Sequence, residues 1–176
     1  MTTSYKSKGM DQLLTNLVKS VGTRKAIEFG TQQGHSAVLI AKGATGTVYT
    51  YDTFSEAYDQ PPFKPTHANY EKALKTTGNY DIWVRKADVF KIKPVSVDTL
   101  HIDICNHYDN VKPLLEAWQS KIKKMIILEG GVYNKWQKKY GFNPFNTILT
   151  EMFMSDWNHV VIRGEGGYAM TVLTRK

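Results

Sequence analysis

Two glycines and an acidic side chain stand where an apolar segment of the chain ends. Residues 26–29 read AIEF, with Glu28 inside the segment, and they are followed by Gly30 and, four residues later, by Gly34. Glycine lets a backbone approach a bound molecule closely, and a carboxylate accepts hydrogen bonds from hydroxyl or amino groups. The pattern therefore predicts a cofactor held against a turn at the end of a buried strand.

Acidic residues also stand at the ends of the other predicted strands, where open α/β sheets bind their ligands. Asp52, at the end of the second strand, can accept hydrogen bonds from both hydroxyls of a ribose. A dinucleotide site would instead show G-x-G-x-x-G with an acid about twenty residues further on. Here the glycines are spaced Gly30-x-x-x-Gly34 and an acid precedes them, so the spacing departs from that motif. The remaining acids at strand ends are Asp88, Asp103 and Glu129.

The elements that would position these residues alternate between helix and strand. Such alternation implies a parallel sheet with right-handed crossovers, and a closing hairpin adds an antiparallel edge. Gly43 follows one predicted helix and Gly78 another, as glycine stops. The periodicity predicts helices at about 10–21, 35–42, 66–77, 109–119 and 143–153, strands at 25–29, 47–51, 80–85, 97–104 and 124–128, and a hairpin over 159–174.

Composition favours one globular domain over residues 1–176, since the chain shows no repeat and no interdomain linker. The single cysteine, Cys105, excludes an intrachain disulfide, and with it we expect a reducing, cytoplasmic location. The first ten residues have no apolar core, so we expect neither a signal peptide nor a membrane anchor. A net charge of +7 favours anionic partners, although no nucleic-acid motif accompanies it.

One stretch resembles a known family. Residues 28–36, EFGTQQGHS, are similar to the E-I-G-T-x-x-G-x-S motif of class I S-adenosylmethionine-dependent methyltransferases, in the catechol and caffeoyl-CoA O-methyltransferase branch. The resemblance continues through residues 47–52 and 99–118. It implies a Rossmann-like, doubly wound, mostly parallel seven-stranded sheet with a C-terminal antiparallel hairpin. It also implies methyl transfer from S-adenosylmethionine to an oxygen of a small-molecule acceptor.

The same resemblance implies roles for individual residues around the cofactor. Asp88 would lie near the adenine amino group, or it simply accepts hydrogen bonds from its own turn. The glycine turn with Glu28 also has a purely structural interpretation. The implied cofactor-binding residues are Gly30, Thr31 and Gly34 around the methionine part, Glu28 orienting the loop or binding the amino group, Ser36 at the carboxylate, Asp52 at the ribose and Asp88 at the adenine.

The reacting end is expected where the fourth and fifth strands finish. If these strands pair in parallel as in the family, Asp103 and Glu129 converge, because neighbouring strands lie about 4.8 Å apart. The resemblance implies a divalent metal there, and oxygen ligands suit Mg²⁺. The family's Asp-Asn after the fifth strand is Glu129-Gly130 here, so the third ligand is open. His107 is a candidate for that ligand or, equally, for the general base that deprotonates the acceptor.

The sequence leaves open how the acceptor is bound and which reaction is catalysed. Residues 53–65 and 132–142 are rich in aromatic side chains and would form a lid over the acceptor, or pack on the core. The acceptor site is either open or completed by a second subunit, which would make a homodimer. The alternative functions are an RNA methyltransferase, supported by the basic charge, and a non-catalytic module that binds the cofactor.

Overall fold

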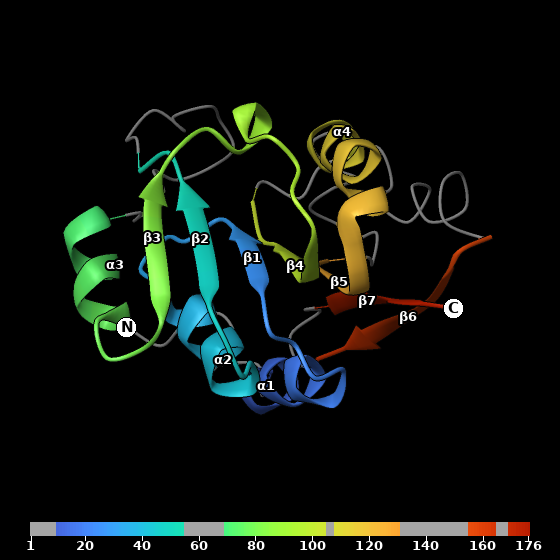
Figure 1. The fold of residues 1–176 in the computed structure, drawn as a ribbon, viewed down its shortest axis with the longest axis horizontal. Coiled ribbons are helices and arrows are strands. Elements are labelled where there is room, and N and C mark those ends of the chain that lie inside the picture. The colour runs from blue at the N-terminus through green and yellow to red at the C-terminus, as the bar shows by residue number, and fades with distance from the viewer. Residues whose placement is uncertain (1–9, 55–68, 105–107, 131–154, 165–168) are drawn as a thin grey trace. The chain divides into compact units, whose positions relative to one another are not determined.

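The computed structural model describes residues 10–54, 69–104, 108–130, 155–164 and 169–176 (Figure 1). The chain forms two compact units, Met1–Lys93 and Pro94–Lys176. The prediction of a single domain over 1–176 stays a prediction. Among the described residues, no helix is long and apolar enough to cross a membrane.

The N-terminal unit contains three parallel strands in the order β3-β2-β1. All four residues of β1 are buried, which explains why this strand reads as an apolar run. Figure 1 shows β2 and β3 side by side with their arrowheads at the same end. The elements of this unit are α1 (Asp11–Ser20), β1 (Ala26–Phe29), α2 (His35–Gly43), β2 (Val48–Asp52), α3 (Tyr70–Thr77), β3 (Ile82–Lys86) and the 3₁₀ turn η2 (Val89–Lys91).

The C-terminal unit contains four strands in the order β4-β5-β7-β6. β4 and β5 are parallel, whereas β7 runs antiparallel to both β5 and β6. The core of this unit includes Trp118 of α4 and Trp157 of β6, which are almost completely buried. The elements are β4 (Val97–Ile102), α4 (Tyr108–Trp118), the 3₁₀ turn η3 (Gln119–Lys121), β5 (Ile122–Glu129), β6 (Trp157–Arg163) and β7 (Ala169–Arg175).

These elements confirm the predicted α/β class, a Rossmann-like, mostly parallel seven-stranded arrangement with a C-terminal antiparallel hairpin. Most bounds differ from the predicted ones by one or two residues. The helix predicted from residue 66 begins at Tyr70, because the Asn69 side chain caps it by accepting a hydrogen bond from the Lys72 backbone N–H at 2.8 Å. The predicted helix at 143–153 and the tip of the hairpin lie outside the described residues.

Gly43 has a different role from the predicted one. It is the last residue of α2 rather than a left-handed stop after it, and the C-cap is Ala44 in an extended conformation. A Cβ at Gly43 would lie 2.3 Å from the Thr15 carbonyl oxygen and 2.9 Å from the Val18 Cβ. Glycine is therefore required here because α1 packs directly against the end of α2.

Candidate functional site

The end of β2 carries the Asp52 carboxylate, which binds two backbone N–H groups. Its Oδ2 accepts from the Gln32 N–H at 2.8 Å, and its Oδ1 accepts from the Phe54 N–H at 2.9 Å. Both donors belong to residues with a left-handed φ of 49°, which is uncommon for side chains other than glycine. A carboxylate has about four lone-pair positions, so Asp52 keeps acceptor capacity for further donors while it binds these two N–H groups, and its predicted contact with a ribose stays a prediction.

Glu28 lies beneath the glycine loop, in register with Thr50 of β2. It is fully buried, and its Oε2 accepts a hydrogen bond of 2.6 Å from the Thr50 hydroxyl. The Thr50 and Thr31 hydroxyls are themselves 2.6 Å apart. A buried carboxylate needs hydrogen-bond donors, and these threonines link Glu28 to the loop. The role of orienting the loop, predicted for Glu28, has this geometry in its favour.

The glycine loop itself is a tight turn between β1 and α2. Gly30 and Gly34 have φ values of 99° and 83°, which favour glycine. The Gly34 N–H donates to the Thr31 carbonyl at 2.7 Å and closes the turn. A Cβ at Gly34 would lie 2.8 Å from Thr77 Cγ2 and 3.3 Å from the Ala73 carbonyl oxygen. Gly34 is therefore needed for packing against α3, a reason separate from any cofactor.

The first turn of α2 follows this loop directly. Its N-cap is Gly34, which offers no side-chain acceptor to the first backbone N–H groups of the helix. Such uncapped groups, together with the helix dipole, favour a bound anion. Ser36 is buried at this end of α2. Partial desolvation lowers the pKa of His35, although the residue as a whole is exposed, and the nearby Lys72 ammonium lowers it further.

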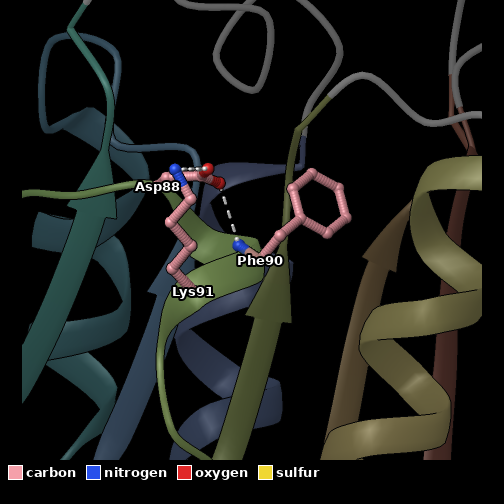
Figure 2. A network of polar contacts seen from close by, with 3 residues as sticks. All are labelled: Asp88, Phe90 and Lys91. Atoms are coloured by element: carbon pink, nitrogen blue, oxygen red, sulfur yellow. Dashed lines mark hydrogen bonds and ion pairs between the residues drawn. The ribbon is translucent and has the colours of Figure 1, made fainter.

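Asp88 accepts hydrogen bonds within its own turn, as one of the two interpretations of the sequence predicts. Its Oδ1 accepts from the Phe90 N–H at 3.1 Å, and its Oδ2 lies 3.4 Å from the Lys91 Nζ. Figure 2 shows the carboxylate turned toward these two groups while the Phe90 ring projects away from it. Asp88 caps η2 in this way, and contact with an adenine amino group stays a prediction.

Glu129 is the last residue of β5, and Asp103 directly follows the parallel strand β4 in the C-terminal unit. Ile102 of β4 pairs with Leu128 of β5, so the two acids stand one residue beyond the same register pair. Neither acid is fully buried. Within the described part of the chain, no three His, Cys, Asp or Glu side chains come together as a metal-binding group. His107, the other candidate in this region, lies outside the described residues, as do residues 55–65 and 132–142 of the predicted lid.

The comparisons with known proteins identify the family. A family of proteins described as "Methyltransferase domain" matches residues 27–128, more than half of the chain. The chain belongs to this methyltransferase family. The match begins in β1 and ends in β5, so it includes the glycine loop, Asp52 and Asp103. No curated protein sequence matches the chain.

Solved structures with the same fold include several methyltransferases. An O-methyltransferase from Bacillus cereus in complex with SAH is 18% identical, with a TM-score of 0.68 over 96% of this chain and 81% of that one. The O-methyltransferase TomG from Streptomyces achromogenes, in complex with SAM, is 16% identical, with a TM-score of 0.65 over 96% and 80%. A candidate rRNA methylase from Clostridium thermocellum is 9% identical, with a TM-score of 0.66 over 92% of each chain. At these identities the likeness shows the fold alone.

Two residues of this candidate site are not among those predicted from the sequence: the buried Thr50 and the strained Gln32. Thr50 was not singled out, although it precedes Asp52 by two residues in the same strand and so shares its face of the sheet. The left-handed conformation of Gln32 has no signal in the sequence. The importance of both residues follows from contacts between β2 and the glycine loop, which depend on how the strands pair.

Proposed function

We propose that the protein transfers a methyl group from S-adenosylmethionine to an oxygen atom of a small-molecule acceptor. Membership of the methyltransferase family supports the transfer of a methyl group. The observation that carries the cofactor assignment is the pairing of the Gly30–Gly34 turn with Asp52, two strand ends tied by the hydrogen bond from the Gln32 N–H. The names of the related structures, O-methyltransferases bound to SAH or SAM, support oxygen as the acceptor atom.

In this proposal the site residues of the N-terminal unit each bind a different part of the cofactor. Asp52 accepts hydrogen bonds from the ribose hydroxyls, and the uncapped first turn of α2, with Ser36, binds the carboxylate of the methionine part. The turn at Gly30 and Thr31 brings the backbone against the methionine chain, and Asp88 lies at the adenine. The bound cofactor supplies a methyl group on a positively charged sulfur, and the residues of the chain supply orientation.

We also propose that Asp103 and Glu129 hold a divalent cation. Mg²⁺ is usually bound through one or two carboxylates, with waters completing its shell. Two carboxylates, each one residue beyond the paired Ile102 and Leu128, match that donor set, and a cation would relieve the repulsion between them. His107 is the candidate for a further ligand or for the base that deprotonates the acceptor hydroxyl.

Thermal unfolding with S-adenosylhomocysteine tests the cofactor assignment. A ligand that binds only the folded state stabilises it by about 2.7 kcal/mol at a hundredfold excess over Kd. For a chain of this size, that free energy raises Tm by roughly 5–10 °C. We expect this rise with S-adenosylhomocysteine and none with NAD at the same concentration.

The opposite result, a rise in Tm with NAD and none with S-adenosylhomocysteine, would contradict the proposed cofactor. A separate experiment measures the binding of a single-stranded RNA and tests the alternative acceptor. Tight RNA binding that weakens steeply as salt is added would favour an RNA acceptor over a small molecule.

A further inference from the structure

Thr50 connects a buried carboxylate to the glycine loop. The Thr50 hydroxyl lies 2.6 Å from Glu28 Oε2 on one side and 2.6 Å from the Thr31 hydroxyl on the other. The three residues are at most 1% exposed to solvent. Groups this deeply buried depend on one another, because a buried polar group that loses its partner carries the full cost of its desolvation.

The number of protons determines the direction of these two hydrogen bonds. A carboxylate only accepts, so the single proton of the Thr50 hydroxyl is donated to Glu28. Thr50 then has only lone pairs to offer, and the Thr31 hydroxyl must be the donor in the second bond. The relay of hydrogen bonds therefore runs from Thr31 through Thr50 to Glu28.

Thr31 is also the residue around which the loop turns. Its carbonyl accepts the Gly34 N–H at 2.7 Å, and the next residue, Gln32, donates its N–H to Asp52. Two alternate residues of β2, Thr50 and Asp52, thus bind two consecutive residues of the loop. The strained φ of Gln32 persists because Gln32 and the preceding Thr31 are both bound by residues of β2.

We propose that Thr50 is a positioning residue for the cofactor. It acts through Thr31, by holding the Gly30–Gly34 turn in the conformation that the methionine part of the cofactor requires. This inference rests on the proposed function of the loop. It assigns a role to a residue outside the E-I-G-T-x-x-G-x-S motif, and it explains why a fully buried hydroxyl stands in the middle of β2.

Three variants test the proposal by calorimetric titration with S-adenosylhomocysteine and by thermal unfolding. Thr50→Val keeps the shape of the side chain and removes the hydroxyl, whereas Thr50→Ser keeps the hydroxyl. Thr15→Val is the matched control, because the Thr15 hydroxyl donates to the Leu39 carbonyl at 3.0 Å in the packing of α1 on α2, away from the loop. We expect Thr50→Val to weaken binding about tenfold or more, Thr50→Ser to restore most of it, and Thr15→Val to lower Tm without a change in affinity.

Amide hydrogen exchange without ligand gives a readout that is independent of the cofactor. Thr50→Val should speed exchange at the Gln32 and Gly34 amides, and Thr15→Val should not. Unchanged exchange and affinity in Thr50→Val would overturn the proposal, as would an affinity loss that follows Tm equally in the two valine variants. If the wild-type chain does not bind S-adenosylhomocysteine, the proposed function fails by itself. The exchange rates then still decide whether Thr50 holds the loop.

Discussion

The strand ends of the two units carry the same kind of residue but are organised differently. In the N-terminal unit, Asp52 and Glu28 accept hydrogen bonds of 2.6–2.9 Å from the glycine loop, from β2 and from the residues that follow β2. In the C-terminal unit, Asp103 and Glu129 each follow a residue of the Ile102–Leu128 pair, and no three described His, Cys, Asp or Glu side chains form a metal-binding group. The acids of the N-terminal unit hold the glycine loop through hydrogen bonds, whereas those of the C-terminal unit follow two neighbouring parallel strands.

The difference indicates how each end would respond to its ligand. Hydrogen bonds that hold a loop before binding reduce the entropy lost when the ligand arrives. Two carboxylates at the ends of adjacent parallel strands repel each other, and a bound cation relieves that repulsion. We therefore expect the N-terminal end to bind its ligand as a preformed site and the C-terminal end to depend on a metal.

The largest expected effect concerns the C-terminal acids. Asp103→Asn or Glu129→Gln should abolish binding of Mg²⁺ and Mn²⁺, because each removes one of two charged ligands, and should leave S-adenosylhomocysteine affinity nearly intact. Calorimetry with both metals, in the presence of S-adenosylhomocysteine, measures this. Asp156→Asn is the control, since Asp156 is an exposed acid of the same unit, 3.7 Å from the Arg175 guanidinium.

If the wild-type chain binds neither metal, and a chelator leaves turnover unchanged, the acids do not form a metal site. His107 would then be the preferred general base, with Asp103 orienting the acceptor.

Removal of the Asp52 carboxylate comes next. Asp52→Ala should weaken S-adenosylhomocysteine binding by about 1.5–3 kcal/mol, the range for hydrogen bonds to a charged group. It should also lower Tm, because the Gln32 and Phe54 N–H groups lose their acceptor. Asp81→Ala is the control, since Asp81 is an exposed acid of the same unit that accepts from the Thr47 hydroxyl. Equal affinities for the two variants would exclude Asp52 from the ribose role.

The packing of the glycine loop gives a smaller effect, measured by denaturant unfolding. Gly34→Ala should destabilise the fold by about 1–2 kcal/mol from its left-handed φ alone, and by more through the contact with Thr77. Gly78→Ala is the matched control, because Gly78 ends α3 with a φ of −60°, which alanine adopts freely. If the Gly34 variant is as stable as the Gly78 variant, the turn accommodates a side chain. The expectation that the loop is rigid before the cofactor binds would then be contradicted.

The smallest effect is a pH dependence at the start of α2. The lowered pKa of His35 means that the unfolded chain binds more protons than the folded one just below pH 6.5. The stability contributed by neutral His35 is complete above pH 6.5 and is lost as the pH falls through the folded-state pKa. Lys72→Met should raise that pKa, which an NMR titration of the imidazole measures. A pKa unmoved by Lys72→Met would leave desolvation as the whole cause.

Periodicity and local turn chemistry depend on neighbouring residues, so the order of helices and strands, the acids at the strand ends and the glycine turn could be predicted from the sequence. The same holds for the antiparallel hairpin, whose strands are close in the chain. The need for glycine at positions 34 and 43, which comes from helix packing, is visible only in the folded chain, as are the two left-handed residues bound by Asp52. The hydrogen bonds that link Glu28 to the loop through Thr50 are visible only there too. Apart from the local bond between Phe54 and Asp52, these contacts join residues about twenty or more positions apart. Their distances depend on strand register and helix approach, which residue types alone do not specify.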